Sequence, residues 1–149
     1  ITAFTIGHSL SLALATLKLI AINTKLIEFL IPATIFLASA GNLFQKTDKF
    51  DSKLHKYKYI AALFFGIIHG MGFSNYLTSL LGTAGNLVTP LFAFNIGIEL
   101  GQNIIVLIIT ALSLIVVDLL RTKRREWVLT WSGAAMGVSV VLMIDRFPW

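Results

Sequence analysis

Apolar stretches of about 20 residues recur along this chain, and a helix needs about that length to cross a bilayer. The chain has 149 residues, of which 56% are hydrophobic and 13% are charged. A soluble domain carries roughly 25% charged residues, so this composition excludes an ordinary soluble domain. We therefore expect an all-α fold, a polytopic bundle of transmembrane helices that forms a single domain over residues 1–149.

The apolar stretches divide the sequence into five expected spans. Their approximate bounds are residues 2–22, 26–44, 59–81, 90–120 and 127–144. The fourth span is longer than a perpendicular crossing of about 30 Å requires, so we expect it to tilt or to extend beyond the bilayer. Because residue 1 is Ile rather than Met, we expect a processed or trimmed chain, with room for one more span upstream.

The Lys and Arg residues predict how the spans are oriented. Nine of the 12 lie in two connecting segments, residues 45–58 and 121–126. A five-span topology places both segments on the same side, and the positive-inside rule makes that side the cytoplasm. We therefore expect both loops to be cytoplasmic and the C-terminus to lie outside. Because the net charge of +5 arises largely from these loops, we expect no nucleic acid as a partner.

Three ionisable residues fall well inside the expected spans: His8, His69 and Glu99. By insertion scales a central acidic residue costs about 2.5–3.5 kcal/mol, so such residues usually face a bundle interior or a wet cavity. Counting residues from the span ends places His69 and Glu99 at a similar depth, with His8 nearer the cytoplasmic end. We therefore expect two or all three of these side chains to meet.

Polar residues near these three indicate a polar seam through the bundle. Asn95, Glu99 and Gln102 are spaced i, i+4 and i+7, which places them on one helix face. Thr5 shares a face of the first span with His8. Asn42, near the inner end of the second span, is interpreted as a helix-packing group or as a further residue of the pathway.

Small residues indicate where helices approach closely. Two small-xxx-small pairs are predicted to pack against neighbouring helices: Gly66 with Gly70, and Gly97 with Gly101. The segment Gly70-Met71-Gly72 is also predicted to interrupt the third span. Unwound backbone at mid-membrane is a device that transporters use to bind ions.

Imidazole, carboxylate and amide groups together suit a borderline divalent metal such as Ni²⁺, Co²⁺ or Zn²⁺. The chain has no Cys, which argues against Cu(I), and the imidazoles argue against Mg²⁺ and Ca²⁺. The same groups can instead relay protons, or they can hydrogen-bond one another and hold the helices together. No tightly bound cofactor is expected, because the metal ion would be a transported ligand.

Three segments of the chain resemble the signature segments of the HupE/UreJ family. They are FTIGHSLSLALA (residues 4–15), FGIIHGMGFS (residues 65–74) and FNIGIELGQ (residues 94–102). Members of this family are membrane proteins found with hydrogenase and urease genes and regarded as nickel or cobalt permeases. The resemblance implies that His8, His69 and Glu99 belong to the metal pathway, with Asn95 and Gln102 as neighbouring or transient ligands. It also implies a multi-pass protein of the bacterial inner membrane.

We therefore predict a permease for a divalent transition metal, nickel or cobalt, with zinc as a further candidate. Its expected partners are the lipid bilayer and the metal ion, with a homo-oligomer or other membrane subunits as further possibilities. The alternative is a non-transporting scaffold or accessory subunit of a larger complex. An enzyme is not predicted: residues 7–11 lack the final glycine of a G-x-S-x-G elbow, and no HExxH motif occurs.

Overall fold

Five α-helices and one π-helical turn make up the part of the chain that the computed structural model describes. The described residues are 2–20, 23–44, 52–81 and 88–148. The elements are α1 (Thr2–Thr16), α2 (Thr24–Phe44), α3 (Ser52–Leu81), α4 (Val88–Leu114), η1 (Ile115–Leu119) and α5 (Arg124–Asp145). No strand occurs among these residues, and the all-α fold predicted from the sequence is confirmed.

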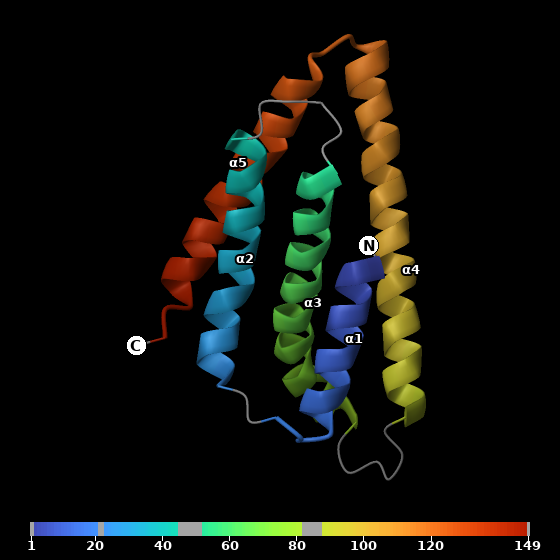
Figure 1. The fold of residues 1–149 in the computed structure, drawn as a ribbon, viewed down its shortest axis with the longest axis vertical. Coiled ribbons are helices and arrows are strands. Elements are labelled where there is room, and N and C mark those ends of the chain that lie inside the picture. Colours follow the sequence, from blue (N-terminus) through green and yellow to red (C-terminus); the bar gives the residue numbers. More distant parts are fainter. Residues whose placement is uncertain (1, 21–22, 45–51, 82–87, 149) are drawn as a thin grey trace.

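The helices are arranged around one closely packed pair, α1 and α3 (Figure 1). Helix α2 contacts both α3 and α5, whereas α4 stands at the edge of the bundle and contacts α1 over a short stretch. Helix α2 ends and α3 begins at one end of the bundle, where α4 also ends and α5 begins. The helix ends that flank the two basic segments therefore lie together; residues 45–51 of the first segment lie outside the described residues.

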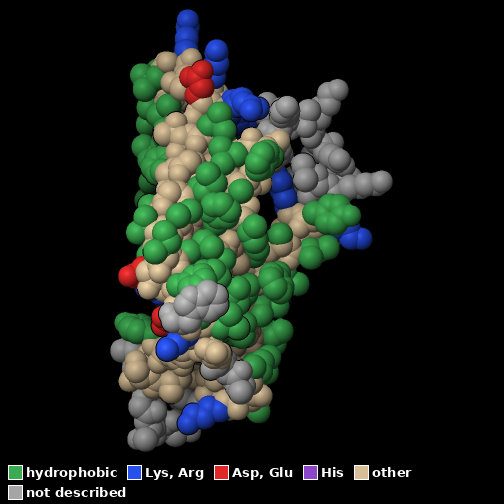
Figure 2. Space-filling model, turned by 90° about the vertical axis from the view of Figure 1, so that its left-hand side faces the viewer, with side chains coloured by type: hydrophobic (Ala, Val, Ile, Leu, Met, Phe, Trp, Pro, Cys, Tyr) green, Lys and Arg blue, Asp and Glu red, His purple; other side chains and the backbone are tan. Residues whose placement is uncertain are grey.

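Four of the helical segments are long and apolar enough to cross a membrane. They are Thr24–Phe44, Lys56–Ser79, Val88–Leu119 and Arg124–Asp145. Beyond Leu91, no residue of α4 or η1 is buried, so these elements expose mainly apolar side chains. Figure 2 shows hydrophobic side chains over much of one face, with Lys and Arg near its upper and lower ends. Large exposed apolar surfaces mark membrane or protein contacts, and here the segment lengths indicate a membrane protein.

Helix α1 ends earlier than the predicted span of residues 2–22. Lys18 has a φ of 58°, in the left-handed region. Its N–H donates to the Ala15 carbonyl at 3.0 Å, and the Leu19 N–H donates to the Leu14 carbonyl at 3.0 Å. These two bonds form a Schellman motif, which closes a helix. A glycine normally occupies the left-handed position of this motif. Because Lys18 occupies it here, the sequence pattern does not indicate where the helix ends.

The left-handed Lys18 gives a direct stability prediction. Lys18→Gly is expected to raise the thermal stability of the detergent-solubilised protein, because a side chain in this conformation costs roughly 1 kcal/mol that glycine avoids. The measurement is the Tm followed by circular dichroism at 222 nm. Lys25→Gly, in the first turn of α2, is the matched control and should lower the Tm. A lower Tm for Lys18→Gly would contradict the assigned backbone conformation.

The predicted interruption of the third span is wrong. Helix α3 is continuous from Ser52 to Leu81 and passes through Gly70 and Gly72 without a break. Gly72 lies against the side chain of Ile31 on α2, which occupies the space that a Cβ would need. The glycines of this segment therefore serve helix packing rather than unwinding.

Helix α4 continues into the π-helical turn η1 before the chain reverses. The Leu120 N–H donates to the Ile115 carbonyl at 3.0 Å, and the Thr122 N–H donates to the Val116 carbonyl at 3.2 Å. Arg121, with a φ of 54°, then turns the chain toward α5. Because π-turns are concentrated at functional sites, the residues around η1 are candidates for a binding site.

Candidate functional site

The structure brings His8 on α1 and His69 on α3 close together. The Phe4 ring contacts both imidazoles, with centroid distances of 6.0 Å to His8 and 5.4 Å to His69. His8 is 2% exposed, which places this pair in the interior of the bundle. His8 and His69 thus contact the same aromatic ring, and we refer to them as the histidine pair.

Glycines on α3 determine how closely the helices of the histidine pair approach. A Cβ added to Gly66 would collide with the Phe4 carbonyl oxygen, and one added to Gly70 would collide with the His8 carbonyl oxygen. The backbones of α1 and α3 are thus in direct contact at the level of the pair. By contrast, a Cβ at Gly97 or Gly101 would meet nothing within 4 Å among the described residues.

A hydroxyl on α2 holds the ring of His69. Thr34 Oγ1 lies 3.1 Å from His69 Nε2 and donates to the Ile31 carbonyl at 2.7 Å. A hydroxyl carries one hydrogen, and the shorter bond to the carbonyl uses it. Thr34 therefore accepts from an Nε2–H of His69. This arrangement leaves Nδ1 of His69 as the unprotonated nitrogen, the form that can bind a metal ion.

His8 carries a buried nitrogen without a protein partner. Its Nδ1 atom is inaccessible to solvent and has no hydrogen-bond partner among the described residues. A buried polar atom in this state costs about 1–3 kcal/mol, and such atoms in native structures usually bind an ion, a water or a substrate. Nδ1 of His8 is thus available to a ligand.

Aromatic rings enclose the histidine pair and link it to α4. Besides Phe4, the ring of Phe73 contacts His8 with a centroid distance of 5.8 Å. Phe73 also contacts Phe94 of α4 at 6.0 Å. Phe94 packs on a small apolar cluster of Leu12, Leu77 and Leu91. These rings connect the histidine pair to α4 through aromatic contacts.

Two of the predicted seam residues on α4 contact α1. Ser9 Oγ donates to Asn95 Oδ1 at 3.0 Å, and Thr5 Oγ1 donates to Gln102 Oε1 at 3.3 Å. Because both amide oxygens accept from α1, the amide sides of Asn95 and Gln102 face the helix that carries His8. Polar side chains of α1 and α4 thus bond to each other at two positions along the helices.

The structure does not bring Glu99 to the histidine pair. Its side chain is exposed, although Asn95 and Gln102 on either side are half-buried. At about 100° per residue, Glu99 lies about 60° around the helix axis from Gln102, so it falls at the edge of the contacting face. Asn42 also lies elsewhere: its Nδ2 donates to Ser132 Oγ at 3.4 Å, between α2 and α5.

Sequence reasoning missed three residues of this site: Thr34, Ser9 and Phe4. A depth comparison would have found Thr34, because it lies about as far from the start of α2 as His69 lies from the end of α3, and these two helix ends lie at the same end of the bundle. Ser9 lies four residues after the seam residue Thr5, and this spacing, which places both on one face of α1, is the signal that could have found it. Nothing in the sequence marks Phe4 as a contact of both histidines.

The residues fit a metal ion in part. No group of three or more His, Asp or Glu side chains within the described ranges is placed to hold a metal ion. The histidine pair offers two nitrogen ligands, so further ligands would come from hydroxyl, amide or backbone oxygens, or from water. A site with only a few protein ligands binds an ion weakly enough to release it again, as transport requires.

Comparison with known proteins gives a match to one family. The family model described as "HupE / UreJ protein" matches residues 1–146 of the chain. No curated protein and no solved structure matches. The resemblance stated from the three sequence segments is therefore confirmed over essentially the whole chain.

Proposed function

This chain belongs to the HupE/UreJ family, and from that premise we propose that it is a permease for a divalent transition metal ion. The family is associated with nickel and cobalt transport, so nickel or cobalt is the proposed substrate, with zinc as a further candidate. The observation that carries the proposal is the buried Nδ1 of His8, which has no partner among the described residues and lies beside His69.

The chemistry of the histidine pair selects among ions. Imidazole suits nickel, cobalt and zinc, whereas Mg²⁺ and Ca²⁺ prefer oxygen ligands. His8 would bind a metal ion through its unpaired Nδ1, and His69 would supply a second imidazole whose ring Thr34 keeps in place. Partners of a ligating imidazole typically fix its orientation and tautomer in this way.

The path is proposed to continue from the histidine pair along α4. Asn95 and Gln102 supply amide oxygens on the side of α4 that faces α1. Helix α4 contacts the rest of the bundle over a short stretch, and a rotation of about 60° would turn Glu99 toward α1. Glu99 would then offer a carboxylate to a cation that leaves the pair. The driving force would be an ion gradient or the membrane potential.

The proposed setting is the bacterial inner membrane. The helix ends that flank the two basic segments lie at one end of the bundle, and the positive-inside rule assigns that end to the cytoplasm. The C-terminus of α5 would then lie outside. This orientation supports uptake or export equally, because the histidine pair lies between the two ends of the bundle.

Metal uptake into proteoliposomes tests the proposed function. Purified protein in liposomes loaded with a metal-sensitive dye is expected to admit Ni²⁺ or Co²⁺ faster than protein-free liposomes, with Mg²⁺ as the unreactive comparison. An imposed membrane potential, negative inside, should speed the influx of the cation. No flux of Ni²⁺, Co²⁺ or Zn²⁺ in either direction, together with stable copurification of other membrane subunits, would favour the scaffold alternative instead.

A further inference from the structure

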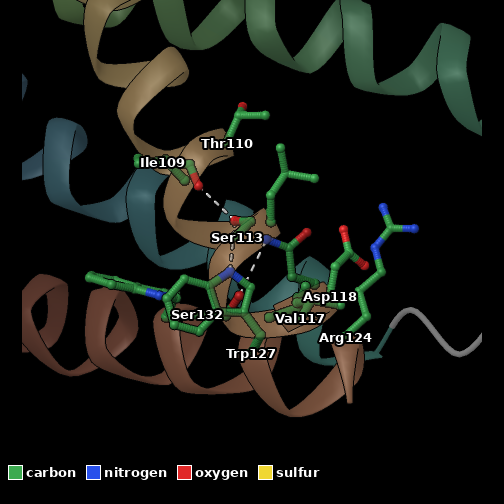
Figure 3. Close-up of a pocket in the computed structure, with 12 residues that line it drawn as sticks. Ile109, Thr110, Ser113, Val117, Asp118, Arg124, Trp127 and Ser132 are labelled. Atoms are coloured by element: carbon green, nitrogen blue, oxygen red, sulfur yellow. Dashed lines mark hydrogen bonds between the residues drawn. The ribbon is translucent and has the colours of Figure 1, made fainter. Parts of the chain in front are cut away.

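A second cavity lies between the end of α4, the turn η1 and the start of α5 (Figure 3). Its volume is about 550 Å³, within the usual range of small-molecule sites. It shares no lining residue with the histidine pair. We call it the η1 cleft. Nothing in the proposed transport path uses it.

The inner wall of the η1 cleft is largely apolar, and two of its polar side chains, Ser113 and Trp127, are hydrogen-bonded to each other. Ile109, Val117 and Val128 belong to the lining. Trp127 Nε1–H donates to Ser113 Oγ at 2.9 Å, and Ser113 Oγ donates in turn to the Ile109 carbonyl at 2.7 Å (Figure 3). Such a wall suits a hydrocarbon chain, because it offers contact area and no unpaired donor from these groups.

Two opposite charges stand at one end of the η1 cleft. Asp118 and Arg124 both line the cleft, and in Figure 3 their side chains extend toward the same end. Within the described residues, the ion pair near this end joins Lys123 to Glu126 at 3.8 Å, and neither Asp118 nor Arg124 takes part in it. A carboxylate and a guanidinium are therefore available to one ligand that carries both an ammonium and a phosphate.

The position of the cleft along the helices matches the depth profile of a phospholipid. Asp118 lies nine residues beyond Ile109, about 13 Å further along the helix axis. The charged end belongs to the end of the bundle where the basic segment 121–126 connects α4 to α5. Trp127 and Trp131 form an edge-to-face pair with a centroid distance of 5.5 Å, and tryptophans gather at membrane interfaces.

We propose that the η1 cleft binds one phosphatidylethanolamine molecule. Its phosphate lies on the Arg124 guanidinium, its primary ammonium lies on the Asp118 carboxylate, and part of one acyl chain follows the wall toward Ile109. Basic pockets between transmembrane helices are known to hold lipid head groups. An anionic lipid without an ammonium would pair Arg124 but would leave Asp118 without a cation and facing a negative charge, so the cleft discriminates against it.

Tryptophan quenching by brominated lipids tests this site in the intact chain. The chain has three Trp, and Trp149→Phe leaves Trp127 and Trp131, both in the cleft lining, as the only emitters. This parent is reconstituted in phosphatidylcholine bilayers that contain increasing fractions of brominated phosphatidylethanolamine, phosphatidylglycerol or phosphatidylcholine. Half-maximal quenching is expected at a roughly fivefold lower fraction of phosphatidylethanolamine than of phosphatidylglycerol, which offers Asp118 no cation, since one charge contact at the surface is worth about that factor. The fraction should also be lower than for phosphatidylcholine, because a quaternary ammonium has no N–H to donate to the Asp118 carboxylate.

Charge variants with matched controls identify the contacts. Asp118→Asn should bring phosphatidylethanolamine quenching to the level of phosphatidylcholine. Arg124→Gln removes a phosphate contact that these two lipids share, so it should leave that preference in place and weaken quenching by phosphatidylglycerol further. Glu126→Gln and Arg125→Gln remove the same charges from residues outside the cleft lining and should leave the preference intact. Equal quenching of the parent by all three lipids would overturn the proposal, because it would mean ordinary boundary lipid. Strongest quenching by phosphatidylglycerol, unchanged in Asp118→Asn, would overturn it in favour of an anionic-lipid site. The order of quenching by the three lipids is measured in the Trp149→Phe parent alone, so this part of the test does not depend on whether the charge variants fold.

Discussion

His69→Ala is expected to reduce nickel or cobalt flux in proteoliposomes at least about tenfold, because changes even in groups that only orient a metal ligand cost ten- to a hundredfold. The variant removes one imidazole of the pair, the one that Thr34 holds in place. His8→Ala should have an effect of similar size. The third histidine of the chain, His55, lies in the basic segment 45–58, so His55→Ala is the matched control and should retain full flux.

Binding and flux together separate the roles of the histidine pair and Glu99. The visible absorption of Co²⁺ reports nitrogen ligation, and this signal should be lost in His69→Ala. Glu99 is exposed and does not contact the pair, so Glu99→Gln should keep the Co²⁺ signal while it slows the flux. Full flux and full Co²⁺ absorption in both His69→Ala and His8→Ala would refute the assignment of the metal ion to this pair.

The sequence predicts the helical fold, but residue counting places His69 level with Glu99 and His8 nearer the cytoplasmic end, so the contact of both histidines with Phe4 could not be predicted from it. Apolar length identifies a membrane helix, and residue counting from its ends gives a depth to within about one turn. It predicts less about rotation around the helix axis. Asn95, Glu99 and Gln102 share one face by spacing, yet the contact with α1 covers only the part that carries the two amides. A difference of about 60° lies beyond what spacing alone resolves.

Other features depend on local backbone states that carry no sequence signal here. Helix α1 ends at a left-handed Lys18, where a glycine would have marked the turn. The π-turn η1 lies inside an unbroken apolar stretch, so the sequence shows one long span and no cleft. Similarly, Gly70 and Gly72 have the composition of a helix break, but tight packing against α1 and α2 retains them in a continuous helix.

Gly70→Ala is expected to lower the stability of the solubilised protein by about 1–3 kcal/mol, the usual cost of added volume in a tightly packed interface. The added Cβ would collide with the His8 carbonyl oxygen, which is backbone and cannot rotate away, and with Ser11 Oγ. Helix α1 must therefore move away from α3. Because His8 moves with it, Co²⁺ binding to the histidine pair should weaken as well, although neither imidazole has been changed.

Gly97→Ala is the matched control, because the same methyl group is added to a helical glycine with nothing within 4 Å of the new atom. Alanine favours the helix over glycine by about 0.8–1 kcal/mol, so this variant should be as stable as the parent or more stable. Denaturation by sodium dodecyl sulfate, followed by circular dichroism, gives both free energies of unfolding. If Gly70→Ala matched Gly97→Ala in stability and in Co²⁺ binding, the backbone contact between α1 and α3 could not be what positions His8 beside His69.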